Sequence, residues 1–326
     1  MKVFITGGTG FIGTHLVRRF SETDHRVTCL VRKSSNTAAI AGAGVELISG
    51  DVTDSAFLYE AIKGHECVIN LANLYSFWVP DPNAYHKVNI DGTRNVMKSC
   101  LEAGVEKVVH ISTGGIYGKP KDSPFTEESE VGPVRFSKYF QTKYEGDQIA
   151  WGLHNNKKLP LVMVYPMAVL GPDDPKATGR YIRRILKRRL PARVLQDCVF
   201  TFVHVRDVVE IIYRVVMKAN NFGEKYLAGK FQYTFGEINR MVSKISGVRL
   251  PLFSLPDLWV IFGSKLLTGI ADVIKRPPIW DMAADQIRVM KEGVRADGSK
   301  VEREFAIKYT PIRKAIEEAI NSYQDR

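Results

Sequence analysis

A glycine-rich turn close to the amino terminus constrains the fold of this chain more than any other stretch. The first thirteen residues read MKVFITGGTGFIG, and Gly7, Gly10 and Gly13 follow the spacing G-x-x-G-x-x-G between a predicted strand at residues 2–6 and a predicted helix. In such a turn one glycine reverses the chain, another lets the backbone approach a pyrophosphate, and a third packs the helix on its strand. The helix N-terminus adds unpaired N–H groups. Because glycine turns without a ligand are common, it is the position between strand and helix that predicts a dinucleotide-binding site.

Apolar strands and amphipathic helices alternate through the first half of the chain. We predict strands at residues 26–32, 45–48, 67–72, 107–113 and 161–165, and helices at residues 55–62, 84–103 and 137–153. This alternation is typical of a parallel sheet covered on both faces, and right-handed crossovers make such a sheet doubly wound. The sequence therefore predicts an α/β Rossmann fold with a smaller C-terminal substrate-binding region. Residues 1–170 form the dinucleotide-binding domain, to which residues 201–230 return, and residues 171–326 mainly form the substrate-binding region.

The cysteine spacing and the apolar stretches indicate the cellular compartment and whether the chain spans a membrane. Its 4 cysteines are scattered without C-x-x-C spacing, which argues against a disulfide framework or a metal site and indicates a reducing compartment. The first predicted strand begins at Lys2, so we expect no signal peptide and a cytoplasmic location. Residues 258–274 are apolar, but Lys265 and Asp272 interrupt them. We therefore predict a buried or interfacial helix there and no membrane span.

Positive charge is concentrated in one short segment. The formal net charge is +11, and seven of the basic residues are Arg180, Arg183, Arg184, Lys187, Arg188, Arg189 and Arg193. Nucleic acid, an anionic membrane or a phosphorylated substrate could each use such a group. No aromatic residues interleave as base-stacking platforms would, so we expect no nucleic-acid partner and interpret the segment as a solvated helix face. Peripheral membrane contact through this segment and residues 258–274 stays open as an alternative.

A threonine, a tyrosine and a lysine are the candidate catalytic residues. Thr113 ends a predicted strand, and Tyr139 and Lys143 of YFQTK lie four residues apart on one face of a predicted helix. A lysine ammonium near a phenol lowers the phenol's pKa from about 10, so that the tyrosine can exchange a proton with a carbonyl or hydroxyl oxygen. Such pairs occur by chance in many helices. The signal comes from their combination with the glycine turn and Thr113.

At this point the sequence resembles the extended short-chain dehydrogenase/reductases, in particular the NAD-dependent epimerase/dehydratase family. The segments that carry the resemblance are TGGTGFIG at 6–13, DVTD at 51–54, NLAN at 70–73, VNIDGTRNV at 88–96, ISTGGIYG at 111–118, YFQTK at 139–143, YPMAVLGP at 165–172 and FVHVRDVV at 202–209. Residues 75–81 (YSFWVPD) and 177–182 (ATGRYI) are similar to the dihydroflavonol-reductase-like branch, which includes hopanoid-associated sugar epimerase-like proteins.

The resemblance implies a role for each matching position. Tyr139 would be the general acid/base, Lys143 would tune it and hold the nicotinamide ribose, and Thr113 would hydrogen-bond the reacting oxygen. The implied cofactor-binding residues are Gly7, Thr9, Gly10, Phe11, Ile12, Asp51, Val52, Leu71, Ala72, Asn73, Ser112, Tyr139, Lys143, Pro166 and Ala168. The expected substrate residues are Tyr75, Trp78, Thr113, Met167, Arg180 and Tyr181. The family's usual His-x-Ala-Ala is replaced here by residues 70–73 (NLAN).

Relatives pair through helices equivalent to residues 84–103 and 137–153. We therefore expect a homodimer.

The end of the second predicted strand indicates which nicotinamide cofactor binds. NAD-preferring sites usually place an acid there to bind the ribose hydroxyls. This chain has Arg32 and Lys33 instead, which suit a ribose 2′-phosphate. We therefore predict that NADP(H) is preferred, with NAD(H) as the alternative.

Catalytic and binding residues of related enzymes that are absent from this sequence limit the type of reaction it can catalyse. Dehydratases of the family resemble one another in carrying Asp-Glu after the strand-end Thr, where this chain has Gly114 and Gly115. Many nucleotide-sugar enzymes carry an Arg-Asp pair where this chain has Phe200 and Thr201. We therefore predict hydride transfer between NADP(H) and a carbonyl or alcohol of a small apolar or cyclic substrate. A C4-type nucleotide-sugar epimerase that uses the same Thr, Tyr and Lys, and a cofactor-binding redox sensor without catalysis, are the alternatives.

Overall fold

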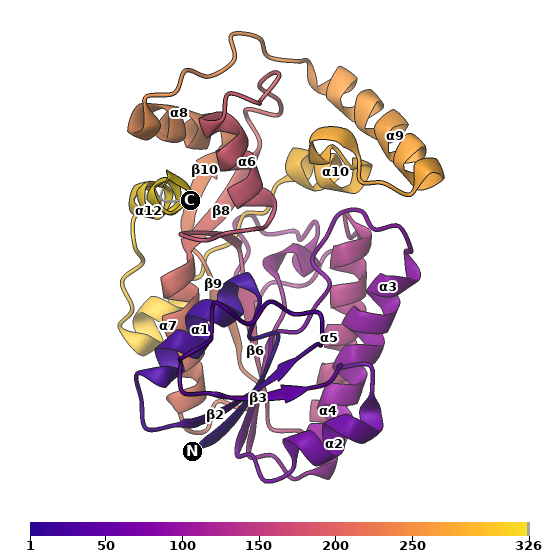
Figure 1. Cartoon of the computed structure of the whole chain (residues 1–326), viewed down its shortest axis with the longest axis vertical. Coiled ribbons are helices and arrows are strands. Elements are labelled where there is room, and N and C mark those ends of the chain that lie inside the picture. Colours follow the sequence, from indigo (N-terminus) through magenta and orange to yellow (C-terminus); the bar gives the residue numbers. More distant parts are fainter. Residues whose placement is uncertain (325–326) are drawn as a thin grey trace.

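The chain is built around a parallel sheet, as predicted, and this sheet has a seventh strand, β9, beyond the six predicted. The computed structural model describes residues 1–324. The strand order is β3-β2-β1-β4-β5-β6-β9 (Figure 1). The bounds are β1 Lys2–Thr6, β2 Arg26–Val31, β3 Glu46–Ser49, β4 Cys67–Asn70, β5 Lys107–Ile111, β6 Leu161–Pro166 and β9 Lys225–Ala228. Thr6 lies opposite Leu30 on β2 and Asn70 on β4, so the carboxyl ends of these strands meet at one edge. Ligands of doubly wound sheets bind outside this edge.

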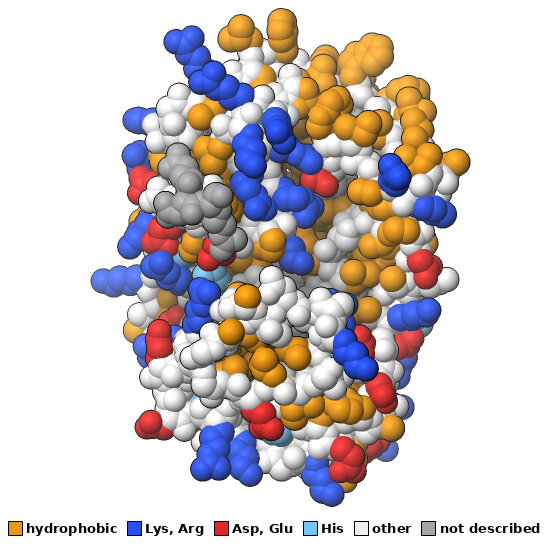
Figure 2. All heavy atoms as spheres, viewed as in Figure 1, with side chains coloured by type: hydrophobic (Ala, Val, Ile, Leu, Met, Phe, Trp, Pro, Cys, Tyr) orange, Lys and Arg blue, Asp and Glu red, His pale blue; other side chains and the backbone are white. Residues whose placement is uncertain are grey.

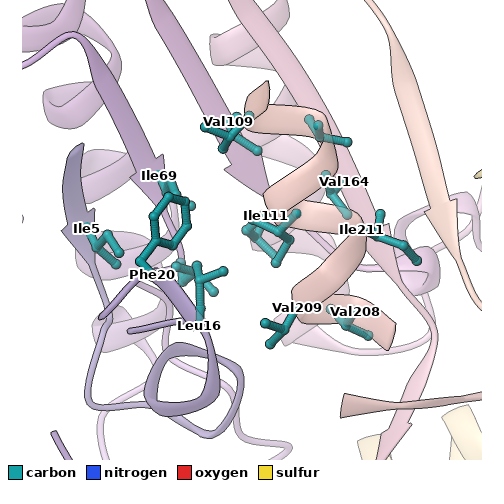
Figure 3. Packing of buried hydrophobic residues seen from close by; sticks show 14 of the residues in the cluster. Ile5, Leu16, Phe20, Ile69, Val109, Ile111, Val164, Val208, Val209 and Ile211 are labelled. Atoms are coloured by element: carbon teal, nitrogen blue, oxygen red, sulfur yellow. The ribbon is translucent and has the colours of Figure 1, made fainter. Parts of the chain in front are cut away.

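Helices cover both faces of the large sheet. α1 (Phe11–Ser21) and α7 (Val205–Met217) lie on one face. The other face is covered by α2 (Ser55–Ile62), α4 (Thr93–Glu102) and α5 (Lys138–Lys157). Figure 3 shows Leu16 and Phe20 of α1 beside Ile5 and Ile69 of the sheet, and all four side chains are fully buried. Burial of one such side chain stabilises the fold by about 1.5–3 kcal/mol, so these contacts fix the helix that follows the glycine turn.

The long helix predicted at residues 84–103 is present as one continuous run, residues 83–102, that contains a π-helical segment. It consists of α3 (Asn83–Tyr85), a π-helical segment at His86–Gly92, and α4. Inside the π segment the buried Asn89 accepts a hydrogen bond from Leu74 N at 2.7 Å and donates one to Thr142 Oγ1 at 3.0 Å. A π-helical turn widens the helix by one residue. The widened turn holds the loop after β4 against α5.

A second, three-stranded sheet and six further α-helices form most of the remainder of residues 1–324. The sheet has the order β10-β8-β7, and its strands are β7 Ala168–Leu170, β8 Val199–His204 and β10 Phe231–Thr234. The helices are α6 Ala177–Leu186, α8 Phe235–Ser246, α9 Asp257–Ile274, α10 Ala284–Glu292, α11 Ser299–Phe305 and α12 Ile312–Gln324. Residues 201–230, predicted to return to the large sheet, contain most of β8, which belongs to the small sheet. They also contain α7 and β9, which belong with the large sheet.

Two expectations about absent features can be compared with residues 1–324. In this range the structure has no cluster of three or more His, Cys, Asp or Glu side chains placed to hold a metal ion. None of the helices described has the length and apolar character needed to cross a bilayer.

His204 and Asp207 join elements of the fold. His204 Nδ1 accepts from Arg206 N at the start of α7, and Asp207 accepts two hydrogen bonds of 2.8 Å from Thr310.

Candidate active site

The glycine turn forms a cradle that has no room for side chains. Gly7 adopts φ +71°, and a Cβ there would lie 2.7 Å from the carbonyl carbon of Leu71. A Cβ on Gly13 would lie 2.2 Å from the carbonyl oxygen of Gly7. Gly10, the N-cap of α1, supplies no side-chain cap, so the amide groups of the first turn are left for a ligand. This close backbone and uncapped helix N-terminus fit the diphosphate of a dinucleotide.

A cavity of about 510 Å³ extends from this cradle along the carboxyl edge of the large sheet. It brings together most of the residues named from the sequence. Those lining it are Gly7, Thr9, Gly10, Phe11, Ile12, Arg32, Asp51, Val52, Leu71, Ala72, Asn73, Tyr75, Ser112, Thr113, Tyr139, Pro166, Met167, Ala168 and Tyr181. Their positions beyond β2 and β3 at one end, and beyond β6 at the other, make the cavity long enough to span the sheet edge.

Four of the named residues do not line this cavity. Lys33 lies outside it, and Lys143 is buried below it, where Nζ donates to Ile111 O at 3.0 Å. Trp78 Nε1 donates to Asp272 Oδ1 at 2.8 Å, and Arg180 Nε lies 3.0 Å from Asp281 Oδ2. The structure therefore places the side chains of Trp78 and Arg180 against α9 and the turn that follows it, because acidic partners hold them there.

Tyr139 stands among aromatic rings at the middle of the cavity. Its ring centroid lies 5.0 Å from that of Tyr75, 6.4 Å from that of Phe77 and 5.6 Å from that of Phe140. Burial, with smaller effects of Tyr75 and Asp147, raises the pKa of Tyr139 well above its usual value. The sequence-based expectation of a lowered pKa is not met, because Lys143 bonds to a backbone carbonyl and burial dominates. The phenol is therefore protonated at neutral pH.

A chain of buried polar side chains runs beneath the cavity floor, and the sequence analysis missed it. Thr6 Oγ1 donates to Asn70 Oδ1 at 2.5 Å, and Asn70 Nδ2 contacts His110 Nδ1 at 3.0 Å. Ser112 Oγ donates to Asp147 Oδ2 at 2.6 Å. His110 Nε2 and Asp147 Oδ1 lie 3.3 Å apart without forming a hydrogen bond. A usable signal was present, because Asp147 follows Lys143 by one helical turn and Asn70, His110 and Ser112 lie at adjacent strand ends.

Asp147 stabilises the buried ammonium of Lys143. Burial lowers the pKa of Lys143, and the charge of Asp147 opposes that effect. We expect Asp147→Asn to lower the free energy of unfolding by about 1–3 kcal/mol, because the variant weakens the bond from Ser112 and removes the compensating charge. Urea denaturation measures this. The half-buried Glu145 on the same helix is the control, and Glu145→Gln should stay within about 0.5 kcal/mol of the parent; equal effects of the two substitutions would contradict the role of Asp147.

The far end of the cavity is lined mostly by residues outside the motifs named from the sequence, the exceptions being Phe202 of FVHVRDVV and Phe200, which stands in place of an arginine. They come from the small sheet and the helices beside it, and they are Phe200, Phe202, Phe235, Gln286, Val289, Met290 and Val294. Asp174 and Lys176 also line the cavity, and burial lowers the pKa of Lys176. Tertiary packing alone brings these residues to the site, so periodicity could not single them out.

Gly114 and Gly115 leave space that neighbouring side chains fill. A Cβ on Gly114 would lie 2.2 Å from Met167 Cε, and a Cβ on Gly115 would lie 2.1 Å from the Phe140 ring. Larger acidic residues at these positions would displace Met167 and Phe140 from the cavity wall. The glycines are thus part of an apolar wall.

Comparison with known proteins places the chain in a family. A model of the NAD dependent epimerase/dehydratase family matches residues 3–229. The chain is 30% identical to the sterol demethylase protein B of Methylococcus capsulatus, over 100% of this chain and 99% of that protein. It is 29% identical to the Synechocystis sp. protein named "Putative dihydroflavonol 4-reductase", over 99% of this chain and 94% of that protein.

A solved structure agrees with this placement. The crystal structure of gox2253 superposes with a TM-score of 0.84 and 31% identity, over 99% of this chain and 98% of that one. The region matched by the family model contains the glycine cradle, Thr113, the Tyr139–Lys143 pair and the strands of both sheets up to β9, whereas β10 lies beyond it. The protein is therefore an enzyme that belongs to the NAD-dependent epimerase/dehydratase family.

Proposed function

We propose that this enzyme transfers a hydride between NADP(H) and a carbonyl or alcohol of a small apolar or cyclic substrate. The observation that carries the proposal is the lining of the far end of the cavity, where Tyr75, Phe200, Phe202, Phe235, Val289 and Met290 form apolar walls. The charged residues of the cavity lining are Arg32 and Asp51, beyond β2 and β3, and Asp174 and Lys176, with Lys176 Nζ 5.9 Å from the centroid of the Tyr75 ring. An apolar wall favours a flat or hydrophobic substrate over a charged diphosphate. Two relatives named for a sterol and a dihydroflavonol support this substrate class.

The roles of the central residues follow from their positions. When bound, the nicotinamide cofactor supplies or accepts the hydride. The protonated phenol of Tyr139 delivers the proton to the oxygen when a carbonyl is reduced, and Thr113 orients that oxygen. Lys143 fixes the backbone of β5 through Ile111 O, directly before Ser112 and Thr113. The first turn of α1 and the glycine cradle hold the diphosphate.

The cofactor preference rests on the end of β2. Arg32 and Ser35 line the cavity beside Gly50 and Asp51, and Arg32 N donates to Ser35 Oγ at 3.2 Å. A guanidinium there is suited to a ribose 2′-phosphate.

Arg32→Asp is expected to raise the Kd of NADPH by at least about tenfold and to leave that of NADH within about threefold, since only the 2′-phosphate loses a charge-assisted partner. Fluorescence titration of both cofactors measures this. Lys33→Asp is the matched control, because Lys33 does not line the cavity. Tighter binding of NADH than of NADPH by the parent protein would overturn the proposed preference.

A substrate screen tests the reaction itself. NADPH oxidation is followed by absorbance with a panel of apolar ring ketones and a panel of nucleotide sugars. We expect stoichiometric NADPH consumption and a secondary alcohol product with a ring ketone. Isomerisation of a nucleotide sugar without net cofactor consumption would instead establish the C4-type epimerase that uses the same three residues. No turnover of either panel, with tight cofactor binding retained, would favour the redox sensor.

A further inference from the structure

Helix α9 exposes most of its large apolar side chains to solvent and buries Val260, Ser264 and Ala271 against the protein. The exposed fractions are 79% for Leu258, 70% for Trp259, 68% for Phe262 and 81% for Val273. Ser264 and Ala271 are buried on the inner face, where α9 packs on α10. A surface helix of a globular protein normally has the opposite arrangement. A contiguous apolar surface of this kind marks a site of interaction.

The loop before α9 and the turn after it extend this apolar surface. Leu252 and Phe253 of the loop are 88% and 76% exposed, and Trp280 of the turn is 49% exposed. We call the surface formed by these residues and the outer face of α9 the apolar ridge. In Figure 2 orange side chains gather at the end of the molecule where Figure 1 places α9, away from the large sheet.

The basic segment adjoins the apolar ridge at both of its ends. Arg193 N donates to Phe253 O, and Arg193 O accepts from Leu255 N, both at 2.9 Å. Arg184 donates to Trp280 O and to Asp281 Oδ2. A groove between these two links is lined by Arg180, Arg183, Arg184, Lys187, Arg188, Arg189, Leu190, Pro191 and Trp280. Blue side chains lie next to the apolar ridge in Figure 2.

We propose that the apolar ridge and the basic groove together dock this enzyme on the surface of an anionic lipid bilayer. Leu, Phe and Trp side chains enter the boundary between headgroups and acyl chains, and arginines beside them attract anionic headgroups. Seven basic residues are concentrated in the segment, and Asp281 is the acidic residue ion-paired with Arg180 and Arg184. A second copy of this chain is disfavoured, because a two-fold pairing would bring two like-charged grooves to one interface.

Two helices, α6 and α10, connect the proposed docking surface to the wall of the cavity. α6 carries three arginines of the groove and also Tyr181 of the cavity wall, while α10 supports α9 and contributes Val289 and Met290 to that wall. Docking therefore brings the apolar end of the cavity near the bilayer. The test does not depend on the proposed reaction, because it measures binding only.

Flotation with lipid vesicles tests the proposal. We expect the full chain to float with vesicles of phosphatidylcholine and phosphatidylglycerol, and at least about fivefold less with pure phosphatidylcholine. Trp259→Ser/Phe262→Ser and, separately, Lys187→Glu/Arg189→Glu should each lower the partition coefficient about tenfold. The matched controls should not change it. They are Met217→Ser/Phe222→Ser, which alters exposed apolar residues elsewhere, and Lys63→Glu/Lys98→Glu, which makes the same change of charge on exposed residues outside the basic groove.

Fluorescence quenching by brominated lipids locates the contact. Quenching is expected in the parent protein and should fall in Trp259→Phe, which keeps an apolar side chain. If the parent protein floats with neither vesicle, the proposal is overturned. Equal flotation of the parent, the apolar-ridge variant Trp259→Ser/Phe262→Ser and the basic-groove variant Lys187→Glu/Arg189→Glu also overturns it. If sedimentation velocity shows a parent dimer that Trp259→Ser/Phe262→Ser dissociates while flotation is unchanged, the apolar ridge is an interface between two copies and the proposal is wrong.

Discussion

Replacing Tyr139 with Phe is expected to lower kcat by about 10²–10⁴-fold while leaving cofactor affinity within about twofold. The phenol is the proton donor in the proposed reduction, and burial keeps it protonated because its pKa lies above the usual value. Removing one oxygen preserves the aromatic contacts of the ring with Tyr75 and Phe140. The variant therefore loses the proton donor but keeps the aromatic contacts of the ring. Steady-state turnover and cofactor titration measure the two effects separately.

Tyr75 offers a matched control for this experiment. Its ring packs edge-on against Tyr139, and it lines the same cavity. Tyr75→Phe removes the same atom from a neighbouring ring and should reduce kcat by less than about tenfold, since only one of the two phenols delivers the proton. Near-normal turnover of Tyr139→Phe would refute the assignment. Equal losses in both variants would show that the cavity depends on polarity in general.

Gly13→Ala is expected to weaken cofactor binding by more than about tenfold and to destabilise the fold by about 1–3 kcal/mol. The added methyl group would lie 2.2 Å from Gly7 O and 2.8 Å from Gly8 Cα, and both are backbone atoms. The turn must move to relieve these contacts, so the cradle and the N-terminus of α1 move with it. Cofactor titration and thermal unfolding measure the two losses.

A second helical glycine provides the control. A Cβ on Gly152 in α5 would meet nothing within 4 Å. Gly152→Ala should therefore stabilise the protein by up to about 1 kcal/mol, because alanine loses less backbone entropy in a helix. Stabilisation by both substitutions, with unchanged cofactor affinity, would contradict the role given to the Gly13 contact.

Local patterns in the sequence predicted the large sheet and the position of the site. Strands such as β1 and β5 are short apolar runs bounded by polar residues, and parallel pairing places Gly7 and Thr113 at one edge. The site follows from this alternation because each strand end faces the same side. For this reason the cavity contains most of the residues named from the sequence.

Other features depend on contacts that periodicity does not encode. β9 is four residues long and gains its place by pairing with β6. The apolar end of the cavity joins Phe200 of β8 to Met290 of α10, which are ninety residues apart in the sequence. The raised pKa of Tyr139 follows from burial rather than from its spacing to Lys143. Each of these is a consequence of tertiary packing.

The return of α7 and β9 to the large sheet limits how this fold can be divided. A fragment that ended at residue 170 would leave β6 as an edge strand, paired with β5 alone, and would uncover Ile111 and Val164, which lie in one buried cluster with α7 (Figure 3). Residues 1–170 alone therefore lack contacts that complete the large sheet and its buried cluster. An exchange of the substrate-binding region that kept the large sheet complete would have to leave residues 205–228 in place, because α7 and β9 lie between segments of the small sheet in the sequence and belong to the large one.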